Sequence, residues 1–391
     1  MNLLEIQKAL VASEMDAWLL FDFHGMNPIA ARVAGLSGGH MITRRWFGLI
    51  PSSGEPVWLH SAIEAHVFSE LPGRKVAYVG WRQLEEYLRG LIQGHRRVAM
   101  EYSPGGAIPY VSRVDGGTLE MVRTCGAEVV SSADLVQFFE ARWSPEALAS
   151  HRRSARHLDE IVQSTFHEIA QAVGSGRSRT EHEIQQFMLE LFRKRDLMAE
   201  PPIVAVNANA GNPHYEPVEG RSASIKNGDL VLLDLWCREK GDSAVFADIT
   251  WMGFVGKTVP TRYDDVWQAV AGARDVAIAY VLDAVKDGKI LRGCDVDDVA
   301  RAFIRDRGYE RFFIHRTGHN VGREVHGNGA HLDNLETRDE RRLIPATGFT
   351  IEPGVYLPEY GIRSEVNLFI AERGAEVTTS VQDRITPILV Q

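Results

Sequence analysis

Hydrophobic positions in the first third of the chain follow two different spacings. Residues Leu3–Ala12 place apolar side chains three and four positions apart, which predicts an amphipathic helix. Residues 17–23 (AWLLFDF) form a nearly continuous apolar run, which is typical of a buried strand. Shorter apolar runs predict strands at residues 57–60, 76–79 and 98–102 and a helix at residues 84–92. This alternation predicts an α/β layer with a mixed sheet.

A helix start marks the beginning of a second region. Ser144, Pro145 and Glu146 supply a capping hydroxyl, a proline at the first helical position and an acidic first turn. The amphipathic pattern that follows predicts a long helix to about Ala172. We therefore expect two domains, an α/β N-terminal domain over residues 1–143 and a second domain over residues 144–391.

Helices and strands fall into separate blocks in the second domain. Helical patterns cover residues 151–197, and apolar strand patterns follow in IVAV, DLVLLDLW and FADITWMGF. Two more helical stretches cover residues 262–286 and 295–308, and we expect strands from Arg311 to the end of the chain. This segregation predicts an α+β fold class.

Two aspartates interrupt the apolar strands of this domain. Asp234 lies in LVLLDLWC and Asp248 in VFADITW, and their midpoint is Gly241 within a polar loop. If the strands form a hairpin that turns there, the two carboxylates lie opposite each other on one face. Buried anions that face each other need a cation between them. The alternative for this pair alone is that one or both aspartates lie at a loop edge in water.

A second acidic pair repeats this arrangement. Glu352 in GFTIEPGVYL and Glu365 in YGIRSEVNLFI fall within predicted strands joined by a short turn at residues 358–361. We interpret the two acidic hairpins as halves of a pseudo-symmetric domain that close on a common centre.

Histidines and glycines lie between the two acidic pairs. His315, His319 and His326 occupy FFIHRTGHNVGREVHGNG, and His214 occupies NPHYEP. A single histidine is more often a core or surface residue than a ligand. Here, one imidazole with four carboxylates makes an oxygen-rich set that suits Mn, Co or Fe, or Zn in a two-metal site.

Composition narrows the class further. The chain has 391 residues and a net charge of -9, with acidic and basic residues interspersed, so we expect no nucleic-acid partner. There is no glycine loop of the phosphate-binding type and no apolar segment long enough to span a bilayer, so we expect neither a nucleotide cofactor nor membrane insertion. Three separated cysteines indicate a reducing compartment, and we expect a cytoplasmic protein.

The ordered segments VLLDLW, FADIT, HRTGHNVG–VHG, TIEPGVY and GIRSE resemble the pita-bread metallopeptidases, the family of aminopeptidase P, prolidase and methionine aminopeptidase. The two-domain plan also resembles creatinase, in which some metal ligands are replaced; all five positions are kept here, which favours the metal-dependent branch. The resemblance implies a pita-bread catalytic domain, a creatinase-like N-terminal domain and a homodimer. It implies two divalent ions (Mn, Co or Zn) held by five ligands: Asp234, Asp248, His319, Glu352 and a bridging Glu365.

The same resemblance implies roles for residues around the metals. His214, His315 and His326 match histidines that support the ligands or face the substrate, and Arg363 and Tyr356 match further family positions. A surface arginine and a packing tyrosine are the alternatives for the last two. Two departures are the 14-residue spacing of the aspartates, against about eleven in many members, and Trp251–Met252 where many peptidases carry Arg and Thr.

These expectations lead to a hydrolytic mechanism. A water bridging two metals becomes hydroxide near neutral pH. We expect Glu352 to shuttle its proton, and His214 and His326 to donate hydrogen bonds to the developing oxyanion. The implied substrates are short Xaa-Pro peptides, cleaved by an Xaa-Pro dipeptidase or aminopeptidase P. The alternatives are a metal-dependent C–N hydrolase or lyase of a small non-peptide metabolite, and a non-catalytic interaction protein, which the complete ligand set disfavours.

Overall fold

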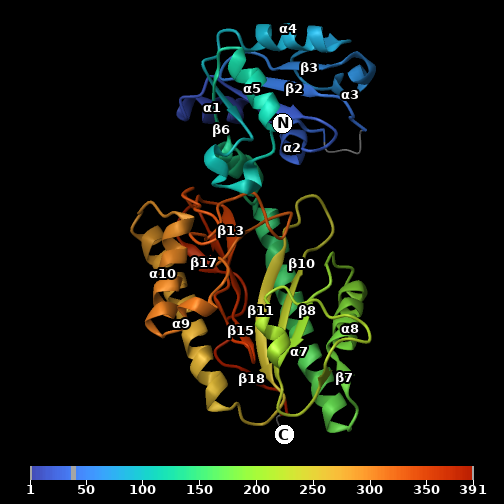
Figure 1. Cartoon of the computed structure of the whole chain (residues 1–391), viewed down its shortest axis with the longest axis vertical. Helices are drawn as coiled ribbons and strands as arrows, with labels where there is room; N and C mark the ends of the chain where they lie inside the picture. The colour runs from blue at the N-terminus through green and yellow to red at the C-terminus, as the bar shows by residue number, and fades with distance from the viewer. Residues whose placement is uncertain (1, 37–40, 390–391) are drawn as a thin grey trace. The chain divides into compact units, whose positions relative to one another are not determined.

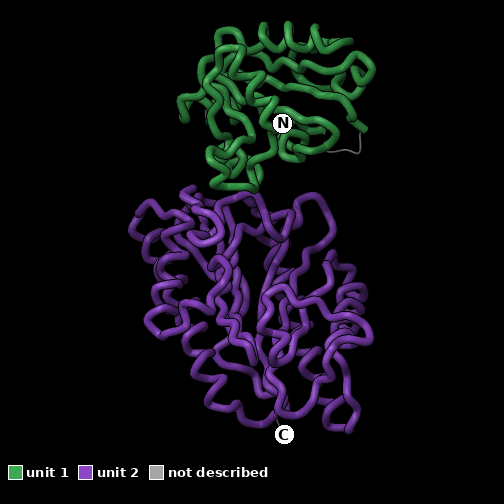
Figure 2. Tube along the Cα trace, in the orientation of Figure 1, with its two compact units in different colours: residues 1–140 green, residues 141–391 purple. Residues whose placement is uncertain are grey.

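The structure is a computed structural model that describes residues 2–36 and 41–389. Its chain divides into two compact units, unit 1 at Met1–Glu140 and unit 2 at Ala141–Gln391 (Figure 2). The division falls three residues before the predicted boundary, because Trp143 belongs to unit 2. Its ring packs on Phe369, and its indole Nε1 donates to the carbonyl of Val321 at 3.0 Å.

Unit 1 is a mixed six-stranded sheet with the strand order β4-β3-β2-β1-β5-β6. The predicted mixed α/β layer is confirmed, although the sequence pattern missed β2 and β6. The strands are β1 (Ala17–Asp22), β2 (Trp46–Pro51), β3 (Val57–Ser61), β4 (Arg74–Tyr78), β5 (Arg97–Met100) and β6 (Glu128–Ser131). The helices are α1 (Leu3–Ala12), α2 (Pro28–Ala34), α3 (Ala65–Phe68), α4 (Trp81–Ile92), α5 (Gly116–Thr124) and α6 (Ala133–Val136).

Both faces of the unit 1 sheet are covered, which explains the continuous apolar run of β1. Trp18 and Leu20 pack into one apolar core, and Leu19 and Phe21 pack into another. Successive side chains of a strand point to opposite faces, so a central strand with two buried faces is apolar throughout.

Unit 2 separates helices and strands in the chain, as the α+β prediction expects, and the predicted strand pairs form. In Figure 1 the helices lie on either side of the strands. The helices are α7 (Pro145–Gly174), α8 (Glu181–Lys194), α9 (Thr261–Lys286) and α10 (Gly293–Asp306). One four-stranded sheet has the order β18-β11-β10-β8, and a second has the order β12-β13-β16-β17. Two short pairs, β14-β15 and β7-β9, complete the set.

The strands of the first large sheet are β8 (Ile203–Val206), β10 (Leu230–Cys237), β11 (Ala247–Phe254) and β18 (Thr386–Pro387). Those of the second are β12 (Asn320–Val321), β13 (Thr347–Ile351), β16 (Val366–Ile370) and β17 (Ala375–Val377). The short pairs consist of β14 (Gly354–Tyr356), β15 (Gly361–Arg363), β7 (Arg179–Thr180) and β9 (Ser224–Ile225).

Helix α7 begins where the sequence predicts. The Ser144 side chain accepts a hydrogen bond from the backbone N–H of Ala147 at 3.2 Å, and Pro145 occupies the first turn, where no N–H is needed. The helix packs its apolar face against the β10/β11 hairpin.

The expectation of strands from Arg311 onward is wrong for the first part of that region. Residues Glu310–Phe312 form a 3-10 turn, and the first strand begins at Asn320. In the loops that follow, a carboxylate accepts hydrogen bonds from backbone N–H groups that a neighbouring strand would otherwise accept. Asp333 accepts hydrogen bonds from the backbone N–H groups of Leu335, Glu336 and Thr337. These side-chain acceptors satisfy the backbone locally, which is how aspartate competes with regular structure.

None of the helices in the described part of the chain is both long and apolar enough to cross a bilayer.

Candidate metal centre

The register of β10 against β11 places the two aspartates on one face. Asp234 pairs with Thr250 and Trp236 pairs with Asp248, so the hairpin is centred on residue 242. The sequence midpoint, Gly241, was one residue off, which shifts the cross-strand partner by two. The aspartates are therefore diagonal neighbours on the shared face, and the prediction that they lie directly opposite is wrong.

The two glutamates oppose each other at a break in the strands. Strands β13 and β16 pair up to Ile351 and Val366, and β14 and β15 resume at Gly354 and Arg363. The same register places Glu352 opposite Glu365 in the interruption, so Glu352 does not lie within a strand as predicted. Pro353 follows Glu352 and has no N–H to continue the ladder, which accounts for the break.

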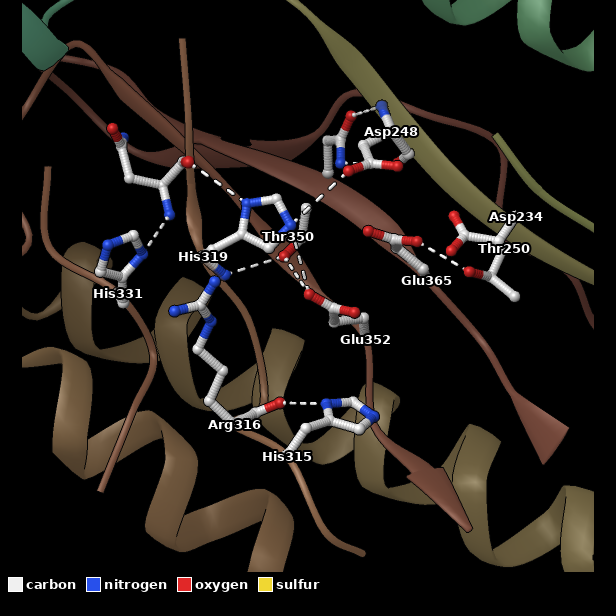
Figure 3. A network of polar contacts seen from close by, with 12 residues as sticks. Asp234, Asp248, Thr250, His315, Arg316, His319, His331, Thr350, Glu352 and Glu365 are labelled. Atoms are coloured by element: carbon white, nitrogen blue, oxygen red, sulfur yellow. Dashed lines mark hydrogen bonds and ion pairs between the residues drawn. The ribbon is translucent and has the colours of Figure 1, made fainter. Parts of the chain in front are cut away.

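A contact between β11 and the second hairpin brings the two acidic pairs together. Thr250 and Glu365 form an isolated β-bridge, and the Thr250 hydroxyl donates to Glu365 Oε2 at 2.8 Å. In Figure 3 the carboxylates of Asp248, Glu352 and Glu365 point toward a common space.

His319 completes this space from the HRTGH segment. Its backbone N–H donates to Thr350 Oγ1 at 2.9 Å. Gly318 permits this close approach, because a Cβ there would collide with the carbonyl of Thr350. The His319 Nε2 atom lies 3.3 Å from Glu352 Oε1 and 3.6 Å from Asp248 Oδ2 (Figure 3).

The neutral His319 ring directs the lone pair of its Nε2 atom toward two carboxylates. Burial lowers the pKa of His319 well below its usual value, so the ring is neutral. Its Nδ1 lies 3.3 Å from the carbonyl of Asn320, which can only accept, so Nδ1 carries the proton. Nε2 therefore offers a lone pair toward the oxygens of Asp248 and Glu352, an arrangement that a cation between them would stabilise.

The donor geometry within the described residues fits such a cation. One potential ligand atom from each of Asp248, His319 and Glu365 lies within 4.8 Å of the other two. Asp248 Oδ1 is buried and has no hydrogen-bond partner among the described residues. A buried carboxylate oxygen without a donor is costly, and metal coordination would remove this cost.

The carboxylates raise one another's proton affinity. Burial raises the pKa of Asp248 well above its usual range, and the charges of Asp234 and Glu352 raise it further. Burial and the charge of Asp248 do the same to the pKa of Glu365. Burial also raises the pKa of Glu352 to about 7, against the opposing charge of Arg363. Without a cation the cluster retains protons that a bound metal would displace.

Asp234 has a different partner. The Arg363 guanidinium donates through Nη2 to Asp234 Oδ2 and through Nε to Thr250 Oγ1, the latter at 2.9 Å. Burial raises the pKa of Asp234, and the charge of Arg363 opposes this. Arg363 thus makes the contact expected of a residue that orients a carboxylate.

Tyr356 and His315 extend this network from the other side of Arg363. His315 Nε2 lies 2.7 Å from the Tyr356 hydroxyl, and Arg363 Nη1 donates to the same hydroxyl at 3.4 Å. Burial, followed by the charge of Arg363, lowers the pKa of His315 to about 3. Burial raises the pKa of Tyr356 to about 12. Neither group carries a charge of its own at neutral pH.

The remaining two histidines lie at the margin of the cluster. The His326 ring packs edge-on against His319, with ring centroids 4.3 Å apart. His214 is exposed, and its side chain makes no hydrogen bond with the described residues. It lines a cavity with Trp236, whose cross-strand partner is Asp248.

Sequence reasoning missed three residues that fix the predicted ligands. Thr250 and Thr350 donate to Glu365 and Glu352, and the Asn367 side chain exchanges two hydrogen bonds with the backbone of Asp248. Each lies two residues from an acidic residue, in DIT, TIE and EVN. The period-two alternation of strands was the signal that would have placed them on the same face.

Trp251 and Met252, the departure from the family pattern, lie on opposite faces of β11. Trp251 lies on the face of β11 that packs toward α7, and Met252 is buried in the core shared with α9. Met252 N–H donates to Gln382 Oε1 at 2.9 Å. Met252 lies on the same face of β11 as Asp248 and Thr250, so this departure shares the strand face that carries the candidate site.

Fold and site together define a class: a two-unit α/β and α+β protein with a buried carboxylate–histidine cluster, as metal-dependent hydrolases have. The comparison with known families agrees, because residues 149–372, more than half of the chain, match metallopeptidase family M24. The chain belongs to this family.

Curated relatives are similar over part of their length. A putative dipeptidase, YkvY of Bacillus subtilis, is 30% identical over 258 residues, which cover 66% of this chain and 65% of the relative. An Xaa-Pro dipeptidase of Pyrococcus furiosus is 28% identical over 250 residues, 64% of this chain and 66% of the relative. The matched segments thus span slightly less than two thirds of these relatives.

Solved structures show the same fold over nearly the whole chain. A dipeptidase PepE from Mycobacterium ulcerans superposes with a TM-score of 0.73 at 18% identity, covering 99% of this chain and 96% of that one. A dipeptidase from Pyrococcus horikoshii gives a TM-score of 0.67 at 24% identity and covers 99% of both chains. The predicted pita-bread fold is confirmed.

Proposed function

We propose that this protein is a dinuclear metallopeptidase that hydrolyses Xaa-Pro bonds in short peptides, as an Xaa-Pro dipeptidase or an aminopeptidase P does. The observation that carries the proposal is the lone pair of His319 Nε2 facing carboxylate oxygens at 3.3 and 3.6 Å in a buried site. Membership of metallopeptidase family M24 and the similarity to Xaa-Pro dipeptidases support the choice of substrate.

Five side chains would hold two divalent ions, Mn, Co or Zn: Asp234, Asp248, His319, Glu352 and Glu365. When bound, the ions would activate a water as the nucleophile and polarise the scissile carbonyl.

Side chains of the protein transfer the proton, bind the oxyanion and orient the ligands. Glu352 moves the proton of the nucleophile, because its Oε2 is free of hydrogen-bond partners among the described residues while Oε1 accepts from Thr350 at 3.1 Å. His214 and His326 flank the cluster and donate hydrogen bonds to the oxyanion. Arg363 orients Asp234, and Tyr356 and His315 hold Arg363.

A bond before proline is a suitable target for such a site. Its nitrogen has no N–H, and the ring fixes φ, so general peptidases handle it poorly. We place the proline ring near His315 and His326. We extend the proposal to a homodimer that works in the cytoplasm.

The test is hydrolysis of Ala-Pro, Leu-Pro and Ala-Pro-Ala by the purified protein, first stripped with a chelator and then resupplied with Mn, Co or Zn. Metal-dependent cleavage of the dipeptides alone supports a prolidase-type enzyme, and cleavage of the tripeptide supports aminopeptidase P. Absence of cleavage with every metal, despite bound metal, overturns the proposal and favours a small non-peptide substrate.

A further inference from the structure

A cavity of about 440 Å³ opens beside the candidate metal centre. Ile203 and Trp236 line it. Ile203 pairs with Asp234 across β8 and β10, and Trp236 pairs with Asp248 across β10 and β11. Residues that pair across strands share a face of the sheet, so the cavity wall and the two aspartates lie on one surface.

The walls of the cavity combine apolar groups with negative charge. Pro201, Pro202 and Pro217 supply apolar surface, with the ring of Tyr215 beside them. Glu200 and Glu216 add two exposed carboxylates to the lining.

Within the described residues, neither carboxylate pairs with a positive side chain. Neither Glu200 nor Glu216 makes an ion pair or side-chain hydrogen bond with the described residues, and the cavity lining includes no lysine or arginine. A group with an apolar stem and a cationic end matches such a lining, because the stem covers apolar surface while the charge stays at the wet rim.

One wall of the cavity is held in place before any ligand binds. Tyr215 donates through its hydroxyl to Glu181 Oε2 at 2.7 Å. Glu181 is fully buried, and it also accepts from the backbone N–H groups of Val206 and Ala223 at 2.7 and 2.8 Å. A wall fixed by these contacts loses little freedom on binding.

We propose that this cavity receives the side chain of the residue before the scissile bond and favours lysine or arginine there. The inference rests on the proposed function and adds its substrate preference. An α-ammonium alone would leave most of the cavity empty, whereas volumes of roughly 300 Å³ and above are typical of pockets for larger ligand groups. The side chain, with its four-carbon stem or its guanidinium, is therefore the occupant.

The first measurement compares Lys-Pro with norleucyl-proline as substrates of the metal-loaded protein. Norleucine keeps an unbranched aliphatic side chain but lacks the ammonium group. Two solvent-screened ion pairs, each contributing about threefold, predict a kcat/KM roughly tenfold higher for Lys-Pro. The double variant Glu200→Gln, Glu216→Gln should bring this ratio close to one.

A control variant tests whether the effect belongs to the cavity. Glu219→Gln removes an exposed carboxylate from the same loop region that does not line the cavity. This variant should keep the wild-type ratio. A wild-type ratio near one, or an equal loss in the control variant, overturns the inference.

A second measurement does not depend on peptidase activity. Lysinamide and norleucinamide contain no bond to proline, and ligand-observed NMR reports their binding to the same metal-loaded proteins. Tighter binding of lysinamide to the wild type, lost in the double variant, supports the cavity's preference even if no dipeptide is cleaved; only the proposed function would then fail. Equal binding of the two amides overturns the inference.

Discussion

Glu101 of unit 1 and the acidic cluster of unit 2 are both buried, but they are stabilised in different ways. In unit 1, Glu101 follows β5 and is fully buried. Its carboxylate accepts hydrogen bonds from Trp18 Nε1 at 2.6 Å, Asn27 Nδ2 at 2.8 Å and Ser132 Oγ at 3.1 Å. Three donors from the chain therefore serve one carboxylate.

In the unit 2 cluster, three donor residues are available to four carboxylates. Thr250 donates to Glu365, Thr350 to Glu352 and Arg363 to Asp234. Asp248 Oδ1 has no donor among the described residues.

Burial of an acid is thus not what distinguishes a metal site, because both units bury acids. The distinguishing property is that the buried carboxylates have too few hydrogen-bond donors and too little positive charge around them. A bound cation would stabilise such carboxylates.

The largest expected effect is on turnover in the unit 2 cluster. Replacing Glu352 by Gln removes the group that we propose moves the proton, and we expect kcat for Ala-Pro to fall by roughly 10³-fold. Bound metal, measured by elemental analysis at saturating Mn, should stay close to the wild-type amount, because Asp248, whose Oδ1 has no donor among the described residues, and the other three proposed ligands remain. A Glu359→Gln variant is the control, since Glu359 is exposed in the turn between β14 and β15. Retained turnover in Glu352→Gln would exclude the proton-transfer role.

The next effect concerns stability with and without metal. A saturating divalent ion at about 100 times its Kd should raise the free energy of unfolding of the wild type by about 3 kcal/mol. Replacing Asp248 by Asn removes a ligand and one of the repelling charges. We expect most of the metal-induced stabilisation to disappear, while the metal-free variant unfolds no more easily than the metal-free wild type. Urea unfolding followed by circular dichroism, with and without Mn, measures both.

The matched control for this experiment is Asp242→Asn. Asp242 is exposed in the loop of the same β10/β11 hairpin, and this variant should keep the full stabilisation by metal. If Mn stabilises Asp248→Asn as strongly as the wild type, the cation binds elsewhere. The lack of hydrogen-bond donors at Asp248 would then not mark a metal site.

Much of the unit 2 site could be predicted because strands impose a period of two. Asp234 and Asp248 stand in apolar runs, and this alone indicated that they face a common buried surface. The offset between them could not be predicted, because the sequence does not show which residue of the connecting loop occupies its centre. A shift of the centre by one residue, from Gly241 to Asp242, moves every cross-strand partner by two.

Other features depended on chain context that the pattern did not show. Pro353 interrupts the ladder beside Glu352 and was a readable signal, because proline cannot donate a ladder hydrogen bond. The loops after Arg311 were harder to predict, since Asp333 replaces strand pairing by accepting from backbone N–H groups. The supporting role of Asn367 joins residues 119 positions apart in the chain, a contact that only the fold creates.

The third prediction concerns the satisfied acid of unit 1. Burial raises the pKa of Glu101 to about 7 from its ordinary 4.5, against the three hydrogen bonds that favour the charged form. The folded state therefore holds a proton that the unfolded state releases. Its contribution to stability is fully present below pH 4.5 and is lost as the pH rises through 7. The total is about 3 kcal/mol for this shift.

The Glu101→Gln variant should show a free energy of unfolding that depends less on pH across this window. The difference between wild type and variant isolates Glu101, because the unit 2 carboxylates titrate equally in both. Urea unfolding at pH 5, 6, 7 and 8 measures it, and the exposed Glu120→Gln serves as the control. Parallel pH profiles for wild type and Glu101→Gln would show that the three donors keep the pKa near its ordinary value.

The smallest effect is expected at Tyr356, whose hydroxyl has hydrogen-bond partners within unit 2, as the Glu101 carboxylate has within unit 1. His315 Nδ1 lies 2.7 Å from the carbonyl of Arg316, so the proton of the neutral ring is on Nδ1, and Tyr356 donates its hydroxyl proton to Nε2. Replacing Tyr356 by Phe leaves His315 Nε2 and Arg363 Nη1 each without one partner, which should cost about 1–3 kcal/mol of unfolding free energy.

Arg363 keeps its contacts with Asp234 and Thr250, so metal-induced stabilisation should be unchanged, and kcat should fall by about tenfold at most. Tyr360→Phe, which removes a hydroxyl bonded to the carbonyl of Arg262, is the control for loss of a single hydrogen bond. A loss of kcat beyond about a hundredfold, with stability preserved, would place the Tyr356 hydroxyl on the substrate instead of behind Arg363.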